Sequence, residues 1–198
     1  MSGRLRLFAA AALLTLVAAC GGGDVDDPAV ASSTPASFRN SGFAACPTGA
    51  GEPPADSPLA GVTALPCMDG SGTSVRVGAP TGRPLVLNLW GSWCPPCGAE
   101  MPSFVRLARA AGSRLAVLGV NTADDARRAV AAAGDLDVTF ANVYDRDQRV
   151  RKALGVNALP VTVFVAADGE VVHVYRGAPL TDATLTALVS RYLGVKVE

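Results

Sequence analysis

The chain has 198 residues, of which 49% are hydrophobic and 6% aromatic, and its 17 basic and 17 acidic residues leave no formal net charge at pH 7. This length and hydrophobic content suffice for one moderate domain with appendages. Because the charge is balanced, there is no electrostatic reason to expect nucleic acid or an anionic membrane surface as a partner.

Residues 1–20 are typical of an export signal. Arg4 and Arg6 supply positive charge ahead of an almost unbroken apolar run at residues 7–17, and small residues then precede Cys20. The segment is too short for a comfortable transmembrane span. Its end resembles a bacterial lipobox, in which the cysteine is lipidated and becomes the mature N-terminus. We therefore expect export and attachment to the outer face of the cell membrane by lipid on Cys20 alone. An ordinary cleaved signal and an uncleaved anchor are the alternatives.

Residues 21–45 are rich in Gly, Ala, Ser, Pro and Asp and predict a flexible tether. Residues 46–72 form an N-terminal extension, in which Cys46 and Cys67 bracket a segment with almost nothing to pack. A disulfide staple is expected in an exported segment without a core. By loop entropy it would contribute on the order of 3 kcal/mol. The alternative is a second redox pair that relays electrons to the downstream cysteines, which would require a strained or exposed bridge.

The patterning becomes globular at residue 73, and residues 73–198 are assigned to one domain. Residues 74–77 alternate as a short edge strand. Residues 85–90 are a nearly continuous apolar run, which suits a central strand buried on both faces. A helical pattern follows, so Cys94 and Cys97 fall at a strand-to-helix junction.

A thiol at the start of a helix meets free backbone N–H groups and the positive end of the helix dipole, which favour its thiolate form. Cys94 is therefore the predicted attacking sulfur, and Cys97, one turn into the helix, is the predicted resolving sulfur. A zinc site is a weaker interpretation, because it would have to recruit Cys46 and Cys67 at unusually wide spacing. A purely structural disulfide is also weaker, since so short a loop adds little stability.

Three sequence runs carry a resemblance: VLNLWGSWCPPC at residues 86–97, EMP at residues 100–102 and GVNALPVT at residues 155–162. They resemble the thioredoxin superfamily, most closely the extracytoplasmic TlpA/ResA-like (DsbE-like) thiol–disulfide oxidoreductases, over about residues 70–195. The resemblance implies an α/β, thioredoxin-like fold with a central mixed sheet flanked by helices. Cytoplasmic thioredoxins have a buried acid six residues before the first cysteine, where this chain has Asn88.

The resemblance also implies roles for residues around the cysteines. Glu100 matches a glutamate of the ResA-like branch and would share a helix face with Cys97, where proton transfer would be its task. The alternative is an acid that complements the helix dipole. Trp93 is implied to be an aromatic lip for partner contact, although a core position is the other possibility. Pro95 and Pro96 complete the implied substrate-binding surface, and Pro95 also suits the first position of the helix.

The rest of the chain alternates between helical and strand patterns, which implies parallel pairing with crossover helices. The first helix has an apolar stripe, interrupted by Pro102, at Phe104, Leu107, Ala108 and Ala111. The later expectations are strands at 115–120 and 138–144, helices at 122–133 and 147–154, a hairpin of 161–166 with 171–176 through an Asp-Gly turn, and a closing helix at 181–193. We expect Thr122 and Thr181 to cap their helices.

The resemblance implies a cis peptide bond between Leu159 and Pro160, placed against the cysteine pair, with the preceding backbone free to pair with a substrate segment. A cis X-Pro bond costs only about 0.5 to 1 kcal/mol over trans, so tertiary contacts can select it. An ordinary trans proline at the start of an edge strand is the alternative. The only histidine, His173, is given no role, which leaves no base for a hydrolase triad.

The implied function is a disulfide reductase for exported proteins, apocytochrome c among the candidates, that receives electrons from a membrane donor of the DsbD/CcdA type. A disulfide-forming oxidant of secreted proteins is the main alternative, because direction depends on how well the Cys94 thiolate is stabilised. A peroxidase of the same fold is weaker, since nothing basic adjoins Cys94. A non-enzymatic module that only binds cysteine-containing partners is a further alternative, which a failure to reduce insulin would favour. No metal or other cofactor is expected, because the dithiol itself carries two electrons.

Overall fold

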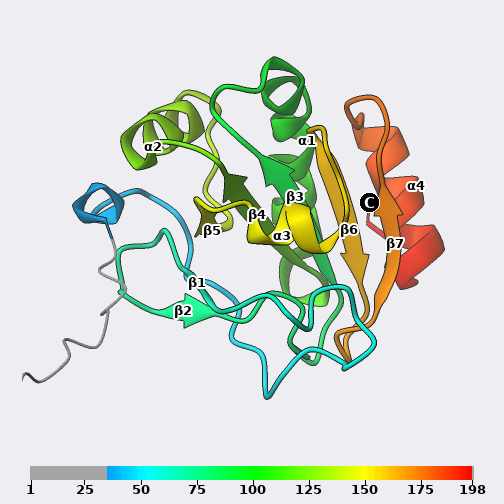
Figure 1. The fold of residues 1–198 in the computed structure, drawn as a ribbon. Helices are drawn as coiled ribbons and strands as arrows, with labels where there is room; N and C mark the ends of the chain where they lie inside the picture. Colours follow the sequence, from blue (N-terminus) through cyan, green and yellow to red (C-terminus); the bar gives the residue numbers. More distant parts are fainter. Residues whose placement is uncertain (1–34, 198) are drawn as a thin grey trace, which may run out of the picture. The chain divides into compact units, whose positions relative to one another are not determined.

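A mixed sheet of five strands, in the order β5-β4-β3-β6-β7, forms the centre of the fold (Figure 1). The structure is a computed structural model that describes residues 35–197. The strands are β3 (Leu85–Trp90), β4 (Ala116–Thr122), β5 (Ala141–Asp145), β6 (Val161–Val165) and β7 (Val171–Tyr175). Strands β3, β4 and β5 pair in parallel, whereas β6 and β7 are antiparallel to their neighbours. The predicted mixed sheet is confirmed.

Strand β3 lies in the middle of this sheet, and all of its residues are buried. A strand covered on both faces requires an apolar side chain at almost every position, which explains the continuous run in the sequence. Leu85, Leu87 and Leu89 pack on one face. Val86 and Trp90 pack on the other. The chain leaves the sheet at Trp90, immediately before the cysteine loop.

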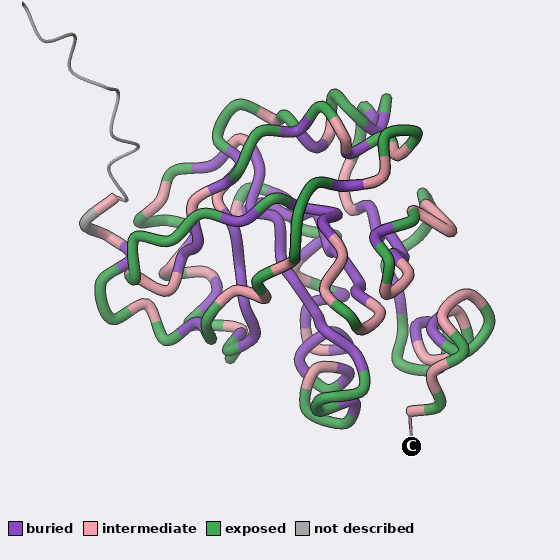
Figure 2. Tube along the Cα trace, turned by 90° about the horizontal axis from the view of Figure 1, so that it is seen from below, coloured by how far each residue is buried: buried purple, intermediate pink, exposed green. Residues whose placement is uncertain are grey.

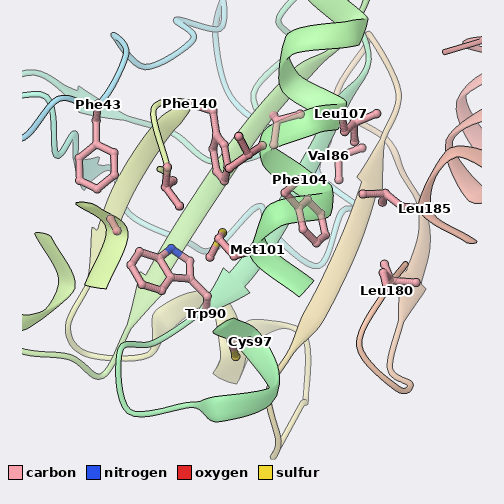
Figure 3. Close-up of a cluster of buried hydrophobic side chains, with 14 of the residues drawn as sticks. Phe43, Val86, Trp90, Cys97, Met101, Phe104, Leu107, Phe140, Leu180 and Leu185 are labelled. Atoms are coloured by element: carbon pink, nitrogen blue, oxygen red, sulfur yellow. The ribbon is translucent and has the colours of Figure 1, made fainter. Parts of the chain in front are cut away.

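Three helices cover the face that carries Trp90: α1 (Pro95–Ala111), α2 (Ala126–Asp135) and α4 (Asp182–Leu193). The stripe expected on the first of them is confirmed, because Phe104, Leu107 and Ala111 are buried in the shared core. Figure 3 shows this core, with Cys97 at one end of it near Trp90. The helix that begins at the cysteines is thus held firmly against the sheet.

Helix α3 (Arg149–Ala153) and residues 59–77 cover the opposite face. The latter include the short antiparallel pair β1 (Leu65–Pro66) and β2 (Ser74–Val75). Their buried apolar side chains include Leu59, Val62 and Val77. Figure 2 shows buried residues running along the central strands. The chain upstream of β3 therefore supplies one layer of the domain.

The outer edge of β5 is covered by the chain around the second extension cysteine. Cys67 forms an isolated antiparallel bridge with Val143, and the N–H of Met68 donates to the carbonyl of Asn142 at 2.8 Å. An open sheet edge invites pairing with another chain, so this cover protects β5 from association.

Two phenylalanines in residues 35–45, a stretch that the sequence assigns to the tether, are buried. Phe38 closes the 3₁₀ turn η1 (Ala36–Phe38), and its ring meets that of Tyr144 edge-on at 5.4 Å between centroids. Phe43 is 7% exposed. The signal segment, Cys20 and the tether up to residue 34 lie outside the described residues.

Most predicted elements are present, with shifted bounds. The helix expected from Thr122 begins at Ala126, because Thr122 ends the buried strand β4 and Asp125 caps the helix by accepting two backbone N–H groups. The strand expected from residue 138 begins at Ala141. Thr181 caps α4 as predicted, and a second 3₁₀ turn, η2 (Gly112–Arg114), follows α1. Among residues 35–197, no helix is long and apolar enough to cross a membrane.

Candidate redox site

Cys94 and Cys97 form a disulfide at the N-terminus of α1, with their Cα atoms 5.3 Å apart. Cys94 is the N-cap residue, and its sulfur accepts the backbone N–H of Cys97 at 3.3 Å. Pro95 and Pro96 follow as the first residues of the helix, where a missing N–H breaks no intrahelical bond. The positive end of the helix thus faces the Cys94 sulfur, which favours its anionic form after reduction.

The two sulfur-bearing residues differ in access. Cys94 is 5% exposed and Cys97 is fully buried in the core cluster. Trp93 is 50% exposed, and both prolines between the cysteines are also exposed. An approaching partner would therefore meet Trp93, Pro95 and Pro96 and could reach Cys94 first.

Glu100 lies beyond the first turn of α1 and is only 1% exposed, unlike an acid that merely complements a helix dipole at the surface. Its Oε1 accepts from Asn88 Nδ2 at 2.7 Å, and its Oε2 accepts from the backbone N–H of Leu180 at 2.9 Å. Burial raises the pKa of this carboxyl above its ordinary value, although the two hydrogen bonds act in the opposite sense. Three residues separate it from Cys97 on the same helix, so both buried side chains lie on one face.

Asn88 supports both protonation states of this carboxyl. It is fully buried in β3 and pairs across the sheet with Thr162, while its amide reaches Glu100. The Oδ1 atom of Asn88 has no hydrogen-bond partner. A rotation of the amide would bring that oxygen to a protonated Glu100, so the buried site need not lose its hydrogen bond when the carboxyl takes up a proton.

The peptide bond between Leu159 and Pro160 is cis, as the resemblance implied. The register of β3 with β6 pairs Leu89 with Val161. Pro160 therefore lies at the same end of the strands as the cysteine loop. Both residues of this turn are half-buried. Arg151 Nη2 donates to the carbonyl of Asn157 at 2.7 Å and so fixes the loop that leads into the turn.

Three contacts of the site were not predicted from the sequence. Asn88 was notable only as a departure from thioredoxins, and the N–H of Leu180 is a backbone group without a sequence signal. Asp124 binds the loop before Cys94, and one feature of the sequence could have pointed to it. It follows a predicted parallel strand, and in open α/β sheets functional groups gather at the carboxyl ends of such strands.

The second disulfide joins Cys46 to Cys67, with Cα atoms 6.0 Å apart and a sequence separation of 21. The bridge expected in the N-terminal extension is therefore present. Cys67 is fully buried beside β5, and Cys46 is half-buried. The bond ties both ends of the extension to the protected edge of the sheet. The expectation that this segment has almost nothing to pack is wrong for its second half, because Leu59, Val62 and Leu65 are buried in the core.

Replacing both Cys46 and Cys67 by serine is expected to lower the free energy of unfolding by about 3 kcal/mol, because the bridge restricts the unfolded chain. In a domain of this size the melting temperature would fall by roughly 6–12 °C. Circular dichroism measures this fall, and the rate of insulin reduction at 25 °C should stay at the wild-type value. An unchanged melting temperature would contradict the staple, and lost turnover in a folded variant would support an electron relay.

The described residues hold few other candidates for chemistry. Between residues 35 and 197, no group of three or more His, Cys, Asp and Glu side chains is placed to hold a metal ion. His173 stacks on Tyr192 with 4.0 Å between ring centroids, so packing explains its position on β7.

The chain is similar to known proteins. A family model described as Redoxin matches residues 45–189. The chain belongs to the Redoxin family. The matched range includes both disulfides, Glu100 and the cis Leu159–Pro160 bond of this redoxin.

Curated relatives of the redoxin are thiol–disulfide exchange proteins. It is 40% identical over 98 residues to the thiol:disulfide interchange protein DsbE of Yersinia pestis, covering 49% of this chain and 50% of that one. It is 29% identical over 110 residues to the thiol–disulfide oxidoreductase ResA of Halalkalibacterium halodurans, covering 55% and 62%. The matches thus span about half the length of the relatives.

Solved structures agree on the fold of this redoxin. MTB DsbF is 27% identical with a TM-score of 0.59, covering 66% of this chain and 94% of that one. A secreted Mycobacterium tuberculosis disulfide oxidoreductase homologous to E. coli DsbE is 26% identical with a TM-score of 0.57, covering 65% and 95%. The thioredoxin-like fold and the resemblance to TlpA/ResA/DsbE-like proteins are confirmed.

Proposed function

We propose that the protein is an extracytoplasmic thiol–disulfide oxidoreductase that reduces disulfides in exported proteins. One observation carries the proposal: a cysteine pair at a helix N-terminus, in which Cys94 is 5% exposed and Cys97 is fully buried, on the same helix face as a carboxyl of raised pKa. Such a pair exchanges two electrons with a partner dithiol without any cofactor.

The reaction has two exchange steps. In the reduced protein, the Cys94 thiolate attacks a partner disulfide, forms a mixed disulfide and releases one partner thiolate. Cys97 then attacks the Cys94 sulfur, which re-forms the intramolecular disulfide and releases the second partner thiolate. The partner has gained two electrons, and the oxidised pair must be reduced again by a dithiol donor.

Glu100 is proposed to take the proton that Cys97 loses before the second step. Cys97 is fully buried, so water has little access to its thiol. A carboxyl whose pKa lies above its ordinary value is a better acceptor at neutral pH, because it can take up and release a proton within the working range. Its hydrogen bonds to Asn88 and Leu180 keep it in place in either state.

The partners and the location extend this proposal. Exported proteins with disulfides, apocytochrome c among them, would be the substrates, and a membrane electron donor of the DsbD/CcdA type would restore the dithiol. The basic and apolar start of the sequence supports export, and lipidation of Cys20 would anchor the protein to the outer face of the cell membrane. If so, the full chain will be recovered with membranes, and its Cys20→Ser variant will not.

The reduction potential of the Cys94–Cys97 pair tests the direction. The protein with its N-terminal segment removed is equilibrated with glutathione buffers, and free thiols are trapped and counted. A value near −270 mV, about that of thioredoxin, would support the reductase. A value near −120 mV, about that of a strong oxidant, would overturn it and make disulfide formation the function. A Cys94 sulfur held at the helix N-terminus serves exchange in either direction, so the potential, and not this contact, separates the two functions.

A further inference from the structure

The loop between β3 and α1 is held by a short turn at the end of the neighbouring strand. Asp124, which is 9% exposed, accepts from the backbone N–H of Ser92 and from its Oγ, both at 2.6 Å. The same carboxylate accepts from Asn121 Nδ2 and from the N–H of Asp125, both at 2.8 Å. A buried carboxylate with four donors is fully occupied, so it fixes the geometry of the groups around it.

Ala123, the residue before Asp124, binds Trp93, the residue after Ser92 in the loop. The carbonyl of Ala123 accepts from Nε1 of Trp93 at 3.0 Å. Consecutive residues of the turn, 123 and 124, thus bind consecutive residues of the loop, 93 and 92. We call residues 123–124 the clamp.

Hydrogen bonds with residues of β5 hold the clamp in one conformation. Ala123 has a φ of 52°, a left-handed conformation that a residue with a Cβ adopts only when its surroundings impose it. Its N–H donates to the carbonyl of Asp145 at 3.1 Å, and Tyr144 Oη donates to the carbonyl of Asp124 at 2.8 Å. Strand β5 therefore holds the clamp in place.

Trp93 is the large apolar side chain that these bonds leave at the surface, with 50% of it exposed. Its ring folds back over Gly91, where an added Cβ would lie 2.6 Å from Nε1 and 2.8 Å from Cε2. The indole is thus confined by a hydrogen bond at its edge and by a glycine beneath it. An exposed aromatic ring held in one orientation costs little entropy when another protein packs on it.

We propose that Asp124 is a positioning residue for protein substrates: through the clamp it holds Trp93 as a fixed docking surface beside Cys94. This role rests on the proposed function, since it concerns how partner proteins reach the cysteine pair. Asp124 contacts neither sulfur in the structure, so its effect should depend on the size of the substrate. A protein disulfide packs on Trp93, whereas a small disulfide needs only the Cys94 sulfur.

Two variants release Trp93 by different routes. Asp124→Ala removes all four hydrogen bonds of the carboxylate. Gly91→Ala leaves Asp124 intact, and its methyl group would push the indole aside, because the neighbouring atoms belong to a movable side chain. The matched control is Asp168→Ala, which removes an exposed carboxylate of the β6–β7 turn that accepts from Glu170 N–H. That turn lies at the opposite end of the strands from the cysteines.

The test compares rate constants for insulin and for the small disulfide 5,5′-dithiobis(2-nitrobenzoic acid). With insulin, both variants should be about 10-fold slower, as expected when an aromatic docking residue is no longer held. With the small disulfide, they should stay within about twofold of the wild type, since Cys94 is unchanged. Iodide quenching of tryptophan fluorescence should increase in both variants and not in the control, because Trp90 is buried.

An equal loss with both disulfides would overturn the docking role, because it would place the effect on the cysteine chemistry. Wild-type insulin rates in the folded variants would also overturn it. A wild-type protein that reduces neither disulfide would overturn the proposed function itself and this role with it. The folded state of each variant is checked by its melting temperature.

Discussion

Cys94→Ser is expected to reduce disulfide exchange below about 1% of the wild-type rate, because only a thiolate attacks a disulfide at useful speed. Cys97→Ser should behave differently. It keeps the attacking sulfur and loses the group that resolves the mixed disulfide, so it should accumulate a covalent complex with the partner. Non-reducing electrophoresis after mixing the reduced variants with insulin separates the two outcomes.

The structure predicts this asymmetry from access and from hydrogen bonding. Cys94 retains some exposure and is the sulfur that accepts a helix N–H, whereas Cys97 is fully buried. The buried Cys97 sulfur can reach the Cys94 sulfur, three residues earlier, but cannot reach another protein. If Cys94→Ser formed the covalent complex and Cys97→Ser did not, the two roles would have to be exchanged.

The remaining cysteines provide the control for this experiment. The protein with Cys46→Ser and Cys67→Ser should exchange at the wild-type rate and should trap no partner, because its active pair is intact. A trapped complex in that variant would indicate that the extension cysteines take part in the exchange.

The parts of the fold that follow from local sequence could be predicted. The apolar run of β3 and the cysteine spacing lie within a few residues of each other, and Pro95 marks the start of α1. Thr181 caps α4 because its side chain accepts the N–H of Thr184, which is a local contact as well.

What the sequence could not show are the contacts between distant segments. The two donors to Glu100 come from Asn88, 12 residues earlier, and from Leu180, 80 residues later. Only the packing of α1 between β3 and the start of α4 brings them together. The burial of Phe38 depends in the same way on Tyr144, far along the chain, so composition alone assigns its segment to the tether.

Helix α2 shows how tertiary structure decides between two local signals. Thr122 and Asp125 both resemble capping residues, three positions apart. The sheet extends through Thr122, which is fully buried, and leaves Asp125 as the first residue free to cap. The residues between them became the turn that holds the cysteine loop.

Glu100→Gln is expected to slow disulfide exchange at neutral pH on the order of 100-fold, the low end of what a positioned acid or base contributes. Without the carboxylate, the buried Cys97 thiol must lose its proton to solvent, so the deficit should shrink as the pH rises. The introduced amide can accept from Leu180 N–H, and Asn88 can turn its free Oδ1 toward the new NH₂ group. Stopped-flow measurement of the second exchange step between pH 6 and pH 10 gives both quantities.

The same substitution should stabilise the oxidised protein at neutral pH. The pKa of Glu100 is raised above its ordinary value of 4.5, mainly by burial, so the folded state holds its proton more tightly than the unfolded chain does. This contribution to stability is fully present below 4.5 and is lost as the pH rises through the folded-state pKa. The glutamine of the variant does not titrate, so the variant does not undergo this loss, and its advantage in free energy of unfolding should grow across that window.

Urea denaturation of both oxidised proteins from pH 4 to pH 8 measures this difference, with Glu170→Gln, an exposed glutamate of the β6–β7 turn, as the control. Identical pH dependence of stability in the wild type and in Glu100→Gln would contradict a raised pKa. A gain in stability with no loss of exchange rate would contradict the proton-transfer role alone. A purely structural carboxyl would be replaced at no cost to activity, whereas a proton carrier is kept in an unfavourable buried position because exchange requires it.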